Sequence, residues 1–172
     1  MSIITKRGDE GETDLLFGRR IRKTSLRVQA LGAVDELNAA LGLARAAGLR
    51  KEIEGIVDRV QEKLVAAMGQ LATLPEDRAR YTYAAIGAED VAWLEQVAKD
   101  MESRGVRFTD WARPGAEGAI ASAALDMART VARRAERQAW ELHEQDGEVS
   151  VDVLLFLNRI SDMMWILARV SA

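Results

Sequence analysis

The spacing of apolar residues along the chain predicts five α-helices. Apolar side chains recur in steps of three and four, which places them on one stripe of a helix. The expected helices span about residues 26–47, 51–72, 88–103, 116–144 and 149–170. Short links between helices favour antiparallel neighbours. We therefore predict an all-α fold, an up-and-down five-helix bundle.

Two of these helices differ in how their apolar residues are distributed. The fourth is predicted to bury a single stripe, consisting of Ile120, Ala124, Met127, Val131, Ala135 and Leu142. The fifth is apolar nearly all round, so it should be buried on most sides. It is expected to be the central helix of the bundle or a contact between subunits.

Composition narrows the function classes. A chain of 172 residues, 48% hydrophobic and 30% charged, is typical of one soluble globular domain. Its formal charge of −3 argues against a protein that coats nucleic acid. With no cysteine and one histidine, His143, the chain has no thiolate chemistry and no multi-histidine metal site.

No apolar run approaches the ~20 residues of a membrane span, and the polar first residues are no secretory signal. We expect a cytoplasmic protein, or a matrix protein without its transit segment.

The first 24 residues form an arm that differs from the bundle of residues 25–172 within the single domain 1–172. Glycines make a helix improbable here, and they let backbone N–H groups turn toward a phosphate, with threonine and lysine as further donors. The candidate phosphate-binding residues are Thr5, Lys6, Gly8, Asp9, Gly11 and Thr13. The Gly-Lys-Ser/Thr ending of a P-loop is missing, and a solvated charged loop is the alternative.

The fourth helix carries a basic face. Arg129, Arg133, Glu136 and Arg137 have the spacing i, i+4, i+7 and i+8, which puts them on one side. Guanidinium groups grouped in this way suit a polyanion such as triphosphate, because each can bind two oxygens at once. An ordinary exposed face with internal arginine–glutamate pairs is the alternative.

Polar residues also interrupt two apolar helices. Asn158 and Asp162 are four residues apart in the fifth helix, where they form a structural polar layer or the edge of a ligand site. Asp35 lies in the first helix. A salt bridge to an arginine suits Asp35 better than a metal, because di-metal bundles use Glu-x-x-His pairs that are absent here.

Together these blocks resemble the ATP:cob(I)alamin adenosyltransferases of the propanediol-utilisation type. The similarity runs in the family's order from residue 5 to residue 169. The blocks that carry it are Thr5-x-x-Gly8-Asp9-x-Gly11-x-Thr13, Lys23, Val34-Asp35-Glu36-Leu37-Asn38, Ala128-Arg129-Thr130-Val131-x-Arg133-Arg134-Ala135-Glu136-Arg137 and Leu157-Asn158-Arg159-Ile160-Ser161-Asp162.

The resemblance implies a homotrimer with active sites between subunits. The arm and Lys23 of one subunit would hold ATP against the helices of a neighbour, and Asp35 would pair with Arg129 across the interface. The neighbour's implied ATP-binding residues are Arg129, Arg133, Glu136, Arg137 and Asn158. The enzyme would transfer the 5′-deoxyadenosyl group of ATP to the cobalt of cob(I)alamin, giving adenosylcobalamin and triphosphate. Mg²⁺ would accompany the nucleotide, and the protein would have no metal site of its own.

The resemblance also implies an aromatic residue beneath the corrin, in the loop before the fourth helix. Trp111, three residues before Pro114, stands where the family usually has phenylalanine, and Phe108 is a second candidate. A flavoprotein reductase and an adenosylcobalamin-dependent enzyme are the implied partners. Because Trp111 and Ala116 depart from the family pattern, a trimeric ATP- and cobalamin-binding or delivery protein with little turnover is the alternative function. A purely structural bundle is the third.

Overall fold

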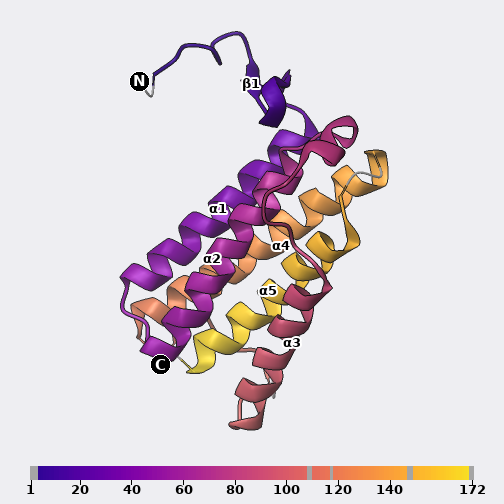
Figure 1. Ribbon diagram of the computed structural model, residues 1–172. Helices are drawn as coiled ribbons and strands as arrows, with labels where there is room; N and C mark the ends of the chain where they lie inside the picture. Colours follow the sequence, from indigo (N-terminus) through magenta and orange to yellow (C-terminus); the bar gives the residue numbers. More distant parts are fainter. Residues whose placement is uncertain (1–3, 108–109, 117, 147–148, 171–172) are drawn as a thin grey trace.

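The computed structural model describes residues 4–107, 110–116, 118–146 and 149–170, and it contains five long helices with a short hairpin at one end (Figure 1). The helices are α1 (Leu26–Ala46), α2 (Lys51–Leu71), α3 (Ala88–Ser103), α4 (Ile120–Asp146) and α5 (Val151–Val170). Successive helices run in opposite directions along the bundle (Figure 1). The predicted all-α up-and-down bundle is confirmed.

Helix α4 lies at the centre of the packing. It contacts α1 on one side and α5 on the other, while α2 packs on α1 and α3 packs on α5. Four buried alanines of α4 allow this, because small side chains let neighbouring helices approach closely; they are Ala128, Ala132, Ala135 and Ala139. As predicted, α5 is buried on most of its surface. None of the described helices is long and apolar enough to cross a lipid bilayer.

Local signals set most helix ends. Ser25 caps α1, because its hydroxyl accepts a hydrogen bond from the Val28 N–H at 3.4 Å. Asp90 accepts from the Gly87 N–H at 3.2 Å at the start of α3. The apolar periodicity places the start of α4 four residues too early. Gly115 and Gly118 have φ values of 71° and 75°, and this left-handed backbone keeps the helix from beginning before Ile120.

Two residues of the predicted α4 stripe do not face the core. The side chains of Ile120 and Met127 are exposed, at 74% and 56%, whereas Ala124, Val131 and Leu142 are buried. The buried side of α4 also contains Leu125 and alanines that the predicted stripe leaves out, among them Ala128, Ala132 and Ala139. The prediction for Ile120 and Met127 is therefore wrong.

The N-terminal arm contains a small hairpin. Strand β1 (Glu12–Asp14) pairs antiparallel with β2 (Arg20–Arg22), and a 3₁₀ turn, η1 (Leu16–Gly18), joins them. Arg20 bridges the hairpin, since its guanidinium lies 3.2 Å from Glu12 and 3.0 Å from Asp14. The sequence predicts the absence of helix in this arm but not the strands.

Hydrogen bonds and an ion pair hold the hairpin against the end of α2 and the segment that follows it. The Leu16 N–H donates to the carbonyl of Ala72 at 3.1 Å. The Nε of Arg19 donates at 2.6 Å to Asp77, which lies in the 3₁₀ helix η2 (Pro75–Arg80). Asp77 also accepts from Arg80 at 2.8 Å, and the guanidinium of Arg80 stacks 4.5 Å from the ring of Phe17. The position of the arm thus depends on the bundle.

The Asp77 contacts predict an acid-sensitive attachment of the arm. Hydrogen bonds from Arg19 hold the pKa of the Asp77 carboxyl below its ordinary value, against the opposing effect of burial. A lowered folded-state pKa stabilises the fold above the unfolded-state value of about 3.9, and this contribution is lost as the pH falls through the folded-state pKa. We expect Asp77→Asn to lower the urea midpoint at pH 7 and to lower it by a smaller amount at pH 3. An equal difference at both pH values would contradict the assignment.

Candidate functional site

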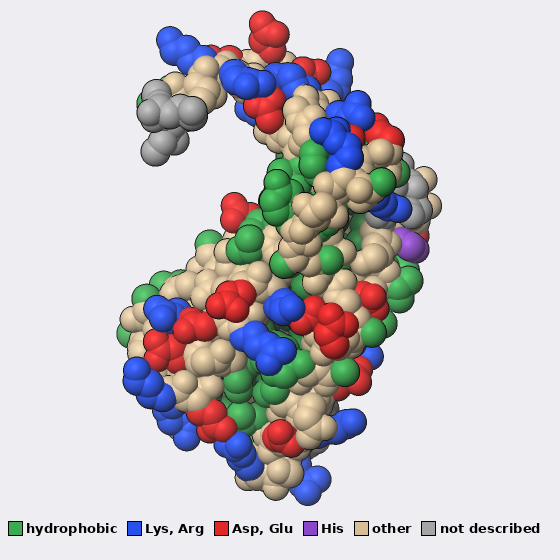
Figure 2. Space-filling model, in the orientation of Figure 1, with side chains coloured by type: hydrophobic (Ala, Val, Ile, Leu, Met, Phe, Trp, Pro, Cys, Tyr) green, Lys and Arg blue, Asp and Glu red, His purple; other side chains and the backbone are tan. Residues whose placement is uncertain are grey.

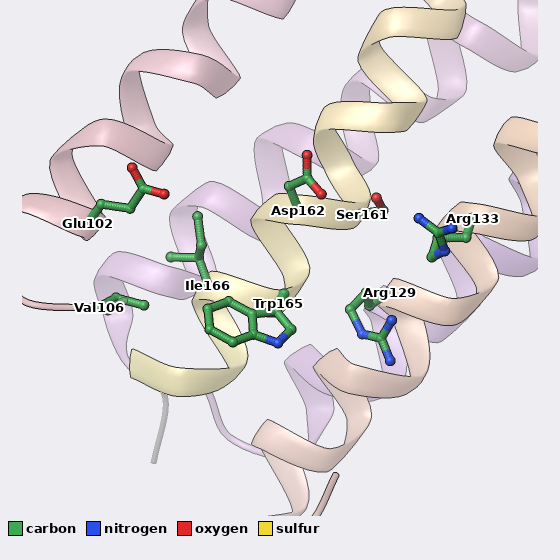
Figure 3. A pocket seen from close by; sticks show the side chains of 8 residues that line it. All are labelled: Glu102, Val106, Arg129, Arg133, Ser161, Asp162, Trp165 and Ile166. Atoms are coloured by element: carbon green, nitrogen blue, oxygen red, sulfur yellow. The ribbon is translucent and has the colours of Figure 1, made fainter. Parts of the chain in front are cut away.

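A cavity of about 340 Å³ opens between the end of α3, the middle of α4 and the C-terminal half of α5 (Figure 3). Helices α4 and α5 run antiparallel here, so their side chains meet across the cavity. Its lining residues are Glu102, Val106, Arg129, Arg133, Ser161, Asp162, Trp165 and Ile166. The cavity therefore has arginines on one wall and an indole, a hydroxyl and a carboxylate on the other.

The two arginines of this wall are differently held. Arg133 is exposed, and its guanidinium has no hydrogen bond or ion pair in the part of the chain that the structure describes. The Nε of Arg129 is buried without a hydrogen bond, and the closest carboxylate oxygen, of Asp126, is 3.6 Å away. The charge of Arg133 is thus available to an anion in the cavity, whereas Arg129 shares its charge with Asp126 over a longer distance.

Asp126 lies beneath this wall and is itself engaged by another arginine. Its side chain is only 3% exposed, and it accepts two hydrogen bonds from Arg169 of α5, at 2.9 and 3.2 Å. The guanidinium of Arg169 also stacks over the ring of Trp165, at 4.9 Å from its centroid. This buried pair therefore fixes one end of α5 against α4 and supports the indole that lines the cavity.

The other predicted residues of the α4 face continue along the same helix. Glu136 accepts a hydrogen bond at 2.9 Å from the amide of Asn158 on α5. Arg137 is exposed and donates to the backbone carbonyl of Arg133 at 3.3 Å. The structure thus keeps Arg129, Arg133 and Glu136 on one side of α4, as their spacing predicts, and it brings Asn158 of α5 against this side.

The arm brings its own predicted residues together as a separate group. The Nζ of Lys23 donates to the carbonyl of Gly8 at 2.6 Å, and the Lys23 N–H donates to the carbonyl of Gly11 at 2.9 Å. A methyl group added to Gly8 would lie 2.8 Å from this Nζ, so the turn and the lysine are closely fitted. Lys6 begins this turn, with a φ of 58°. Asp9 lies within the turn and donates its N–H to the carbonyl of Lys6 at 3.3 Å, while Thr5 precedes the turn and Thr13 lies in β1.

The arm and the α4 face do not meet within one chain. In the described residues, no hydrogen bond or ion pair joins residues 5–23 to α4, and the arm projects beyond the body of the bundle (Figure 2). Asp35 is exposed and has no ion pair among the described residues, while its neighbour Glu36 pairs with Arg134. Trp111 is 73% exposed in the loop before α4. Phe108 lies outside the described residues.

Several residues around the cavity do not stand out in the sequence. Trp165 and Ser161 belong to the largely apolar α5, and Glu102 and Val106 belong to the end of α3 and its loop. One signal is present: Asp126 is a charge within the buried stripe of α4, and Arg169 is a cation in the last turn of the buried α5. A charge in such a position requires a partner.

Comparison with known proteins decides the family. The family model described as cobalamin adenosyltransferase matches residues 3–171, which is nearly the whole chain. The chain belongs to the cobalamin adenosyltransferase family. The resemblance inferred from its sequence blocks is therefore confirmed, and members of this family are transferases.

Two curated relatives of this adenosyltransferase family illustrate the match. The corrinoid adenosyltransferase PduO of Salmonella typhimurium is 36% identical over 98% of this chain and 49% of its own length. The corrinoid adenosyltransferase of Mycobacterium leprae is 37% identical over 98% of this chain and 90% of its own. The chain thus spans about half the length of the PduO relatives and most of the mycobacterial one.

Solved structures of the family have the same fold. A variant of the PduO-type ATP:corrinoid adenosyltransferase from Lactobacillus reuteri, complexed with cobalamin and ATP, superimposes with a TM-score of 0.86 at 31% identity; the match covers 98% of this chain and 92% of that one. A second variant, complexed with ATP, gives 0.85 at 30% identity over 98% and 93%.

Proposed function

We propose that the chain transfers the 5′-deoxyadenosyl group of ATP to the cobalt of cob(I)alamin, releasing triphosphate. Arg129 and Arg133 carry this assignment, because both line a cavity between α4 and α5, Arg133 without an ion pair among the described residues and Arg129 at 3.6 Å from its partner Asp126. A polyanion that is formed during the reaction is the ligand that such a wall stabilises. The family membership of the chain supports the same reaction.

The chemistry of this reaction suits the residues present. The electron pair of Co(I) attacks C5′ of ATP, the Co–C5′ bond forms, and the C5′–O5′ bond breaks. Cobalt becomes formally Co(III), and triphosphate leaves with the electrons of the broken bond. The nucleophile is therefore the substrate, and a chain with no cysteine and one histidine needs to supply none. The protein positions C5′ over the cobalt and neutralises the leaving group.

Mg²⁺ is expected to arrive with the nucleotide. This ion keeps several waters and is held mainly by substrate phosphates, with one or two carboxylates from the protein. In the described part of the chain, no three acidic or histidine side chains are grouped to hold a metal by themselves. Glu136 fits the lesser role, because Asn158 occupies only its Oε1 and leaves the second oxygen for a hydrated ion.

We further propose that the site is completed between subunits of a homotrimer, with the arm of one subunit facing α4 of the next. The separation of the two groups of residues within one chain supports this. Co-expression of Lys23→Ala and Arg133→Ala subunits should then restore activity that neither variant has alone. In a random mixture about one interface in four has an intact arm and an intact α4. Activity near zero in the mixed trimers would contradict a shared site.

Trp111 is proposed to contact the corrin from the loop before α4. We expect Trp111→Ala to lower kcat/KM for cob(I)alamin by about ten-fold, because a large aromatic contact is lost. The Kd for ATP should change by less than about two-fold. Trp140→Ala is the matched control, since Trp140 is also partly exposed but lies on α4, edge-on to His143. Equal losses for ATP and cob(I)alamin would refute the placement of Trp111.

The direct test of the proposed reaction is anaerobic spectrophotometry. Purified protein, ATP, Mg²⁺ and chemically reduced cob(I)alamin should give the absorption spectrum of adenosylcobalamin. If ATP raises the melting temperature but no adenosylcobalamin forms, the alternative of a binding or delivery protein is favoured. If ATP has no effect on melting, the purely structural bundle is favoured. A reductase and an adenosylcobalamin-dependent enzyme remain the proposed protein partners.

A further inference from the structure

A continuous chain of hydrogen bonds crosses three helices and ends in the candidate nucleotide site. Arg159 of α5 donates from Nε to Glu95 of α3 at 2.9 Å, and from Nη1 to the Oδ1 of its neighbour Asn158 at 2.7 Å. The Nδ2 of Asn158 then donates to Glu136 of α4 at 2.9 Å. Glu95 is thus linked to Glu136 through two side chains of α5.

This series of hydrogen bonds fixes which way the Asn158 amide points. A side-chain amide has an oxygen that accepts and a nitrogen that donates, and it can turn over when its surroundings do not distinguish the two. Arg159 has only donors and the Glu136 carboxylate only accepts, so the two groups together direct the oxygen of Asn158 to Arg159 and its nitrogen to Glu136. One N–H of the amide and one oxygen of Glu136 are left for a ligand.

The orientation of Arg159 in turn depends on Glu95. The Arg159 side chain is 33% exposed, so it has room to adopt other rotamers. The carboxylate of Glu95 holds its Nε, and a charge-assisted bond of this kind is stronger than a neutral one. Without Glu95, Arg159 loses its partner on α3 and is free to move away from Asn158, whose amide is then held by Glu136 alone.

We propose that Glu95 is a positioning residue of the nucleotide site, acting through Arg159 on the amide of Asn158 and the carboxylate of Glu136. This role rests on the proposed function, in which Asn158 and Glu136 contact ATP and its metal. Glu95 itself touches no substrate. It contributes by keeping two ligand-binding groups in one arrangement before ATP arrives, which lowers the entropy lost on binding.

A second surface ion pair serves as a control for the possibility that Glu95 only stabilises the packing of two helices. Glu52 of α2 and Arg104, at the end of α3, are 2.7 Å apart and about half exposed, as are many surface pairs. Like the Glu95–Arg159 pair, which is 42% and 33% exposed, it should add little to stability. In the described residues no further hydrogen bond connects Arg104 or Glu52 to the site.

The test compares Glu95→Ala, Glu95→Gln and Glu52→Ala for binding of Mg·ATP by calorimetry and for melting temperature. We expect Glu95→Ala to raise the Kd for ATP about ten-fold, with kcat at saturating ATP lowered less, and to shift the melting temperature by under about 2 °C. Glu95→Gln should lie within about two-fold of wild type, because glutamine keeps an oxygen that accepts from Nε. Glu52→Ala should bind ATP like wild type.

Three results would overturn this role. They are an unchanged Kd in Glu95→Ala, an equal loss in Glu95→Ala and Glu95→Gln, and an equal loss in Glu52→Ala. A wild-type chain that binds no ATP is a different outcome, because it refutes the proposed function first and the positioning role with it.

Discussion

Replacing Arg133 by alanine should lower turnover by about 10²–10³-fold, the usual effect of removing one preorganised group that stabilises charge in a transition state. Arg133 lines the cavity and has no ion pair among the described residues, so its charge is available to the leaving triphosphate. The fold should be nearly unchanged, since alanine has the highest helix propensity and the position is exposed. Steady-state rates of adenosylcobalamin formation, with melting curves, measure both effects.

Arg134→Ala is the matched control for this experiment. Arg134 is the next residue of α4, but it pairs with Glu36 of α1 and does not line the cavity. Its replacement should leave turnover within about two-fold of wild type. If Arg133→Ala retains wild-type turnover, or if the two variants lose activity equally, Arg133 does not act on the triphosphate.

Replacing Asp126 by alanine should lower the free energy of unfolding by about 3–5 kcal/mol, because it leaves a largely buried guanidinium without its partner. The Arg169 side chain is only 16% exposed and makes two hydrogen bonds to this carboxylate. For a chain of this size the loss corresponds to a fall in melting temperature of roughly 10 °C. Urea unfolding and thermal melts measure the change.

Two further variants show whether the buried charge is the cause. Glu141→Ala, on the exposed side of α4, should change the free energy of unfolding by less than about 0.5 kcal/mol. The double variant Asp126→Ala/Arg169→Met removes both charges, so it should be more stable than Asp126→Ala alone. A double variant that is less stable by the sum of the single losses would show that the pair is not coupled.

The sequence predicts a helix well where the apolar period and the residues next to its ends determine its bounds. The period of three and four residues locates α1, α2 and α3 to within a residue or so, and Ser25 is a normal N-cap. The start of α4 is misplaced, because the backbone angles of Gly115 and Gly118 depend on the loop that precedes the helix. The exposure of Ile120 and Met127 is missed for a related reason, since an apolar residue looks the same in sequence whether it is covered or not.

The candidate site also has a part that the sequence predicts and a part that it does not. The spacing of Arg129, Arg133 and Glu136 is enough to place them on one face, because helix geometry alone decides it. The opposite wall of the cavity, with Trp165 and Glu102, arises from the packing of α5 and α3, which no local pattern encodes. The link from Glu95 to Arg159 likewise joins residues that are 64 positions apart in the chain and meet only in the bundle.

The fate of the nucleotide tests the central claim most directly. Protein, ATP, Mg²⁺ and cob(I)alamin should be incubated anaerobically, and the phosphorus-containing products should be separated by ion chromatography. Direct attack of cobalt on C5′ predicts intact triphosphate in equal amount to the adenosylcobalamin formed, and none without cob(I)alamin. ADP and phosphate as the products, or nucleotide turnover that does not require cob(I)alamin, would contradict adenosyl transfer by this chain.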